Sequence, residues 1–243
     1  YNEFVRSGAL LEGEAKERLK AINAELTALT IKFGNNLLAE NGAFFLELNA
    51  QQVKDLPEGV RNQAQEAAIA MGKKDSYVFT LDKPSMLPFL TYSPDRDLRR
   101  ELYNGYLMRC NNDNEFDNKE LAKQMARLRI EKANLLGYEN PAQMILHDKM
   151  AGNPEAVDTF LAGIMAPAVK KAQEEIVDMQ VIMDQDIKAG LLPAGSKIEP
   201  WDWAYYTEKV RKAKYALDEE QTKPYFQMEN VRQGVFDLTT KLW

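Results

Sequence analysis

The chain has 243 residues, and its 31 Lys and Arg against 37 Asp and Glu give a formal net charge of −6. It contains one histidine, His147, and one cysteine, Cys110. A catalytic zinc site normally takes two of its ligands from histidine, so these residues exclude an independent zinc site. The mild acidity disfavours nucleic acid or an anionic membrane as the main partner, because both require a concentrated basic face.

The composition is that of a globular protein and not of a disordered or membrane-spanning one. Hydrophobic residues make up 45% and charged residues 28%, with 13 Gly and 10 Pro. No uncharged stretch reaches the roughly 18 residues that a membrane span needs, although residues 159–169 carry no charge. The chain begins at Tyr1 and stops at Trp243, directly after an apolar-periodic stretch, so we expect it to be part of a longer protein.

The N-terminal part of the chain predicts two helices. Apolar residues recur at three- and four-residue steps over residues 14–40, which indicates a long helix with one apolar stripe. Asn41 and Gly42 follow, and we expect them to end this helix, since glycine in the left-handed conformation is a common helix end. Residues 57–72 predict a second, alanine-rich helix.

Strand signals lie at residues 77–81 and 86–92, joined by a turn at 82–85. They predict one small β-hairpin over residues 77–92. Pro88 lies inside the second run and cannot donate a backbone hydrogen bond, so we expect an edge strand or an irregular hairpin.

Helix-start signals recur in the next segments. Ser93 is expected to cap a helix that begins at Pro94, and Asp117 with Glu120 predicts the start of a helix that reaches Gly137. Each of these helices is expected to bury one apolar face.

Asn153 and Pro154 predict the start of a long helix that continues to Gly190. Pro167 should kink or break it, because proline removes a backbone donor and clashes with the preceding turn. The residues expected to be buried on this helix are Val157, Phe160, Leu161 and Ile164.

Residues 190–200 predict a loop, followed by an aromatic-rich helix over 201–215, a turn capped by Asp218, and a last helix from about Tyr225. The predicted fold class is therefore mainly α, a multi-helix segment with one small β-hairpin near 77–92. The chain has no fixed repeat period, so a solenoid is not favoured.

The one histidine and the one cysteine of the chain each allow two interpretations. His147 does not begin a His-Glu-x-x-His motif, and we favour a structural or surface histidine over the base of a hydrolase. Cys110 lies beside Arg109, which could lower the pKa of its thiol. A half-buried cysteine at a helix end is the interpretation that we favour.

Asp113, Glu115 and Asp117 have the alternating spacing of a calcium loop. The match fails at two demanding positions, where Asn118 stands in place of the loop glycine and Gln124 in place of the terminal acid. We therefore predict a solvated turn followed by a helix cap.

Residues 201–206 contain four aromatic side chains and are the most unusual stretch of the sequence. One interpretation is that Asp202 caps a helix whose aromatic residues anchor the core. The alternative is the aromatic wall of a ligand cleft.

Several motifs resemble, in order, the thimet oligopeptidase family of zinc metallopeptidases. They are LRIEKANLLGY at 128–138, KMA at 149–151, WDW followed by YY at 201–206, and PYF at 224–226. The opening FVRSGA at 4–9 is most similar to the peptidyl-dipeptidase branch. The order and spacing of the motifs carry this resemblance over nearly the whole chain.

The resemblance implies a neurolysin-like helical metallopeptidase, in which residues 1–243 form part of one larger peptidase domain with a sub-boundary in the loop at 190–200. Such enzymes hydrolyse short peptides with a zinc-activated water, and this branch releases C-terminal dipeptides. Their zinc is held by a His-Glu-x-x-His helix and a downstream Glu. None of these is in this chain, so we assign it no catalytic, cofactor-binding or metal-binding residue and expect zinc and oligopeptide substrates only for the longer protein.

The matched motifs also allow structural roles. Trp201, Asp202, Tyr205 and Tyr206 are candidates for the side of a substrate channel or for hinge support, with core packing at least as favoured. Arg129 and Glu131 are expected to hold neighbouring helices.

Two other functions remain open from the sequence alone. One is a helical interaction module without enzymatic activity, which kept the fold and lost the active site. The other is a hydrolase that uses His147. We favour a cytoplasmic location, and an exported or periplasmic protein is the alternative.

Overall fold

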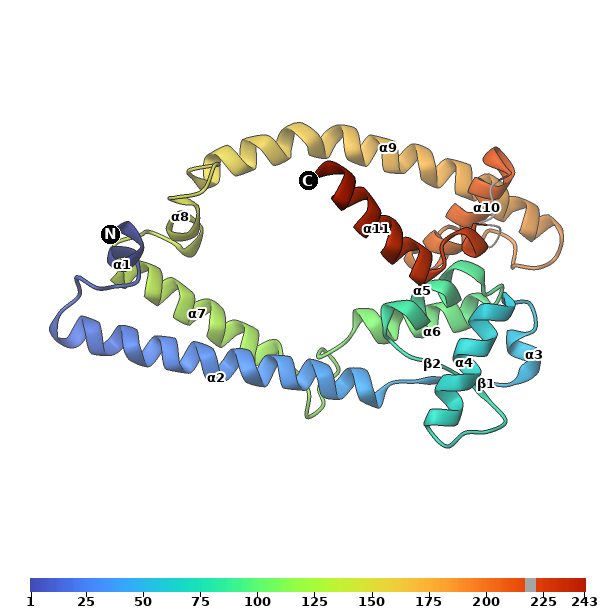
Figure 1. Cartoon of the computed structure of the whole chain (residues 1–243), viewed down its shortest axis with the longest axis horizontal. Helices are drawn as coiled ribbons and strands as arrows, with labels where there is room; N and C mark the ends of the chain where they lie inside the picture. Colours follow the sequence, from blue (N-terminus) through green and yellow to red (C-terminus); the bar gives the residue numbers. More distant parts are fainter. Residues whose placement is uncertain (217–221) are drawn as a thin grey trace.

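The computed structural model describes residues 1–216 and 222–243, which are mainly α-helical (Figure 1). The predicted turn at Asp218 lies outside these residues. The N-terminal elements are α1 (Asn2–Arg6), α2 (Gly13–Ala43), β1 (Leu46–Leu48), α3 (Ala50–Val53), α4 (Glu58–Ala70), β2 (Tyr77–Phe79), α5 (Lys83–Tyr92) and α6 (Arg96–Leu107). They are followed by α7 (Lys119–Leu135), α8 (Pro141–Leu146), α9 (Pro154–Lys188), the 3₁₀-helices η1 (Pro200–Asp202) and η3 (Lys223–Tyr225), and α10 (Trp203–Tyr215) and α11 (Met228–Leu242).

The ribbon outlines an open ring in Figure 1. The paired helices α2 and α7 form one side and α9 forms the other. One end of the ring is a packed body of α3 to α6, the two strands and α10, and the short helices α1 and α8 lie at the other end.

The main hydrophobic core lies in the packed body. Val60 and Ala64 of α4 face the two strands, as the small-residue face of this helix predicts. The core also contains residues from β1, β2, α5 and α6. Its buried members are Leu46, Leu48, Val53, Leu56, Val60, Ala64, Phe79, Leu81, Met86, Phe89, Leu90 and Leu102.

The prediction of a mainly α chain with one small antiparallel sheet is confirmed, but the second predicted strand is wrong. β2 pairs with β1, with Leu46 opposite Phe79 and Leu48 opposite Tyr77. Residues 86–92 belong to helix α5 instead. In α5 the buried residues Met86, Phe89 and Leu90 have the spacing of one helix face, and short apolar runs are ambiguous between strand and helix.

Two predicted helix ends are also wrong. Helix α2 continues through Asn41 and Gly42 to Ala43, and its cap residue Phe44 has an extended backbone. The cap of α6 is Asp95, whose side chain accepts hydrogen bonds from the backbone N–H groups of Asp97 and Leu98, whereas Ser93 ends α5. In both cases a residue two positions later in the chain, Phe44 or Asp95, makes the capping contact.

Helix α9 begins as predicted, because the Asn153 side chain accepts a hydrogen bond from the backbone N–H of Ala156 at 2.8 Å. Of the kink or break predicted at Pro167, the break is wrong, since α9 is one continuous helix. The surrounding residues are exposed, so water can satisfy the carbonyl group that Pro167 leaves without a donor. The predicted burial of Phe160, Leu161 and Ile164 is wrong as well, because all three are exposed.

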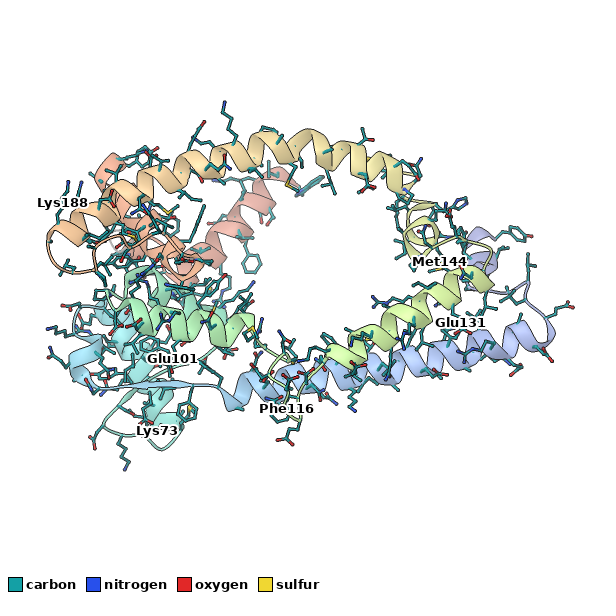
Figure 2. The ribbon with its side chains drawn as sticks, turned by 180° about the vertical axis from the view of Figure 1, so that it is seen from behind. Lys73, Glu101, Phe116, Glu131, Met144 and Lys188 are labelled. Atoms are coloured by element: carbon teal, nitrogen blue, oxygen red, sulfur yellow. The ribbon has the colours of Figure 1, made fainter. Side chains whose placement is uncertain are left out.

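Glu131 holds two helices together, as expected. Its carboxylate accepts hydrogen bonds from Arg18 Nε at 2.6 Å and Arg18 Nη2 at 2.7 Å, which join α7 to α2. Figure 2 labels Glu131 on α7, beside α2. No helix in the described part of the chain is both long and apolar enough to cross a membrane.

Candidate functional site

The aromatic stretch at 201–206 lies at the junction of η1 and α10, where Asp202 is the central buried group. Asp202 is fully buried and forms ion pairs with two arginines of α6. Its carboxylate accepts from Arg96 Nη2 at 2.8 Å and from Arg99 Nη2 at 2.7 Å. The sequence alone did not identify Arg96 or Arg99 as partners of Asp202.

Arg99 is the second fully buried charge of this cluster. Besides Asp202, its guanidinium donates to the backbone carbonyl of Ser93 at 2.7 Å and to that of Trp201 at 3.3 Å. The ring of Tyr205 lies 4.2 Å from the guanidinium carbon, a cation–π distance. We call the group Arg96, Arg99 and Asp202 the buried ion cluster.

The geometry of Asp202 differs from a simple helix cap. It accepts from the backbone N–H of Glu199 at 3.1 Å within a capping box of η1, but it does not cap α10 with its side chain. Hydrogen bonding to Asp202 raises the pKa of the Arg96 guanidinium above its usual value, although partial burial opposes this. The Arg96 guanidinium therefore stays charged, and the cluster links α6 to η1 and α10.

A second polar contact joins α10 to α9. The Tyr206 hydroxyl donates to Asp186 Oδ2 at 2.9 Å, and Lys209 Nζ lies 2.6 Å from the same oxygen. Burial, followed by the hydrogen bond to Asp186, raises the pKa of Tyr206 above its usual value. Tyr206 also packs with Met179 and Met183 of α9, so it is a core residue.

The two tryptophans of the stretch have a different position from the tyrosines. They line a groove of about 620 Å³ between α5, α6, α9 and η1, together with mostly apolar side chains. The two interpretations of residues 201–206 therefore divide by residue: Asp202 and Tyr206 are buried, Tyr205 is half-buried, and Trp201 and Trp203 form a groove wall. The other lining residues are Met86, Leu87, Leu90, Tyr103, Tyr106, Ile176, Ile198, Glu199, Pro200 and Ala204.

Most of the side chains that line the groove are apolar, which suits it to binding an apolar group. Among its described lining residues, Glu199 supplies a carboxylate and Tyr103 and Tyr106 supply phenol groups.

Neither His147 nor Cys110 forms a catalytic arrangement among the described residues. His147 is exposed at the end of α8, and its ring lies 5.8 Å from that of Tyr138. Cys110 is buried, and this burial, reinforced by the Glu40 carboxylate, raises the pKa of its thiol to about 11. The hypothesis of a reactive thiolate activated by Arg109 is therefore wrong.

The acidic turn at 113–117 holds a lysine side chain. Lys119 Nζ lies 2.5 Å from Asp113 and 3.1 Å from Asp117, and Asp117 also accepts from the backbone N–H of Lys119 at 2.9 Å. The exposed turn is as predicted, but the predicted cap is wrong: the N-cap residue of α7 is Asn118, whose side chain makes no cap hydrogen bond, and Glu120 pairs with Lys123 instead.

The chain does not fit the zinc site that the resemblance implies. Within residues 1–216 and 222–243, no three side chains of His, Cys, Asp or Glu come together in a way that could hold a metal ion. The single histidine also lacks the partner that a His-Glu-x-x-His helix requires.

Comparisons with known proteins give one consistent result. Residues 89–243 match the family model described as Peptidase family M3. Oligopeptidase A of Haemophilus influenzae is 32% identical over 246 residues, covering 99% of this chain and 35% of that protein. Dipeptidyl carboxypeptidase of Escherichia coli is 32% identical over 245 residues, covering 100% of this chain and 35% of that protein. The chain thus spans about a third of the length of the curated relatives it matches.

Proposed function

Since the chain belongs to peptidase family M3, we propose that it works as a segment of a longer zinc metallopeptidase that hydrolyses short oligopeptides. The observation that carries this proposal is the alignment of nearly the whole chain with two peptidases at 32% identity. Their names describe an oligopeptidase and a dipeptidyl carboxypeptidase, so both act on peptides.

The finer proposal is that the longer protein releases dipeptides from the C-terminus of its substrates. The opening sequence FVRSGA at 4–9 supports this branch, and so does the similarity to dipeptidyl carboxypeptidase. Oligopeptidase A is equally similar in identity, so the products of hydrolysis must decide between the two.

The catalytic groups belong, in this proposal, to the part of the protein outside residues 1–243. Residues 1–243 serve as framework: the buried ion cluster fixes α6 against α10, and Tyr206 with Asp186 fixes α10 against α9.

We also propose that residues 1–243 form part of one larger helical domain with a sub-boundary in the loop at 190–200, where limited proteolysis should cut first. A cytoplasmic location completes the proposal, and cell fractionation tests it.

The decisive experiment uses the longer polypeptide that contains residues 1–243. We expect it to cleave a quenched-fluorescent oligopeptide, to lose this activity with a chelator and to regain it with zinc. Mass spectrometry of the products should show successive loss of C-terminal dipeptides, and internal cleavage would support the oligopeptidase branch instead. A longer polypeptide that binds no zinc and cleaves no peptide would contradict the proposal and favour a helical module without enzymatic activity.

A further inference from the structure

The N-terminal half of α9 carries an exposed apolar surface on a helix segment without charge. Every residue from 158 to 171 is exposed, and residues 159–169 contain no charged side chain. A helix that is apolar on all sides is typical of a protein core or a membrane span. The large apolar side chains on this segment are Phe160, Leu161, Ile164, Met165 and Val169.

The C-terminal half of α9 shows how the same helix face looks when it is covered. Leu161, Ile176, Met179 and Met183 share one face, since they are separated by whole turns or by three to four residues. Met179 is 2% exposed and Met183 is fully buried against α10, whereas Leu161 is 44% exposed. The packed half lies at the end of α9 that Lys188 marks in Figure 2. The apolar stripe of α9 is therefore covered by α10 at its C-terminal end and exposed to solvent at its N-terminal end.

Helix α11 has a second apolar stripe that is exposed to solvent. Its apolar residues alternate at steps of three and four, which places them on a single face. None of the described residues of α11 is buried. The stripe consists of Met228, Val231, Val235, Leu238 and Leu242.

The relatives indicate what covers these two surfaces. They align with nearly all of this chain, α9 and α11 included, inside proteins of which it is 35%. The large apolar side chains of residues 159–169 lie on about half of the helix circumference, and small uncharged residues such as Ala162, Gly163 and Ala166 occupy the rest. The relatives contain polypeptide beyond the region that matches this chain, so that polypeptide is the occupant that the comparisons favour over a second copy.

We infer that residues 158–171 of α9 and the apolar stripe of α11 are core surfaces, packed against the polypeptide of the longer peptidase outside residues 1–243. This inference rests on the proposed function. It goes further by naming the two helix faces that join this segment to the rest of the protein.

Cysteine accessibility in the longer polypeptide tests the inference. Ile164→Cys and Val235→Cys place a thiol on the two apolar surfaces, and Glu174→Cys and Gln233→Cys are matched controls on other faces of α9 and α11. The unsubstituted protein gives the background, to which the buried Cys110 contributes little. We expect the two apolar positions to react with a thiol reagent at least about tenfold more slowly than their controls. In the 243-residue chain alone, all four positions should react at similar rates.

Equal rates at apolar and control positions of the longer polypeptide would overturn the inference. Slow labelling already in the 243-residue chain, with a doubled mass in solution, would assign the surfaces to a second copy and overturn it too. If a substitution prevents folding, hydrogen exchange of the unsubstituted protein gives the same comparison, with protection of 158–171 and α11 expected only in the longer polypeptide. Peptide hydrolysis measured in parallel separates the two proposals, because a protected but inactive protein would contradict the function alone.

Discussion

The buried ion cluster gives the sharpest test of how the segment is held together. The change Asp202→Ala removes a fully buried carboxylate that pairs with Arg96 and Arg99. Arg99 is 1% exposed and would keep its charge without a carboxylate partner. Removing one member of a buried ion pair typically costs about 3–5 kcal/mol, most of it from the uncompensated charge. We expect a loss of stability of this size.

Urea unfolding followed by tryptophan fluorescence and circular dichroism measures this loss. With a slope of about 3 kcal/mol per M for a chain of this size, the midpoint should fall by about 1 to 1.7 M. Trp201 lies beside Arg96, with 5.9 Å between its ring centre and the guanidinium carbon, so its fluorescence should report the loosening of η1.

The control is Asp178→Ala, which removes the partner of Lys214 in an ion pair between α9 and α10 that is nearly half exposed on both sides. Solvent screens such a pair, so the midpoint should not move measurably. The double change Arg99→Met with Asp202→Leu should recover part of the loss, since it removes the orphaned charge. If Asp202→Ala costs no more than Asp178→Ala, the cluster does not hold α6 to α10 and the reasoning is refuted.

Three further outcomes follow from single side chains. Because burial raises the pKa of the Cys110 thiol to about 11, the folded chain should react with a thiol reagent at pH 8 far more slowly than the urea-unfolded chain, and equal rates would contradict this. Burial alone would raise the pKa of Glu40, but hydrogen bonds from two asparagines and from the backbone of Cys110 lower it below its ordinary 4.5. The resulting stability is present above pH 4.5 and is lost as the pH falls through the folded pKa, so Glu40→Gln should flatten the acid side of a pH–stability profile, and an unchanged profile would count against it. Gly105→Ala would place a Cβ 2.5 Å from the ring of Phe44 and should cost about 1 to 2 kcal/mol. The Cβ added by Gly163→Ala would have no atom within 4 Å, so this change should stabilise the chain by about 1 kcal/mol through helix propensity. Urea midpoints that move in the same direction for the two glycine variants would contradict the packing argument.

The helices that could be predicted are those whose sequence contains its own start signal or stripe. Asn153 caps α9 in the structure as the sequence predicts, and the periodic residues of 14–40 lie in α2. Such signals are local, since a cap bonds to a residue two or three positions away. Residues 86–92 have no such signal, and their run of apolar residues suits a strand or a buried helix equally.

The true partner of β2 carries only a weak signal in the sequence. Leu46, Glu47 and Leu48 alternate between buried and exposed, which is the mark of a strand with one covered face. The run is three residues long, too short to stand out against the apolar residues around it. Pairing across some thirty residues is a tertiary contact, which short-range periodicity does not report.

Only part of the candidate site could be predicted from the sequence, because its remaining members are also distant in the chain. The aromatic stretch and Asp202 were identified by residue type, but Arg96 and Arg99 are more than a hundred positions away in the chain. Their spacing of three places both on one side of α6, next to the buried Leu102. A pair of arginines beside an apolar face is the available signal, because a buried arginine requires an acidic partner somewhere in the fold.

The wrong burial prediction for Phe160, Leu161 and Ile164 has a different cause, and it supports the inference about α9. Periodicity reports which face of a helix avoids water, but it does not report which polypeptide covers that face. The same stripe is covered where α10 is present, at Met179 and Met183, and bare where the described chain offers no neighbour. The pattern therefore describes the environment of α9 in a larger protein, and the exposed half of α9 marks where residues 1–243 require further polypeptide.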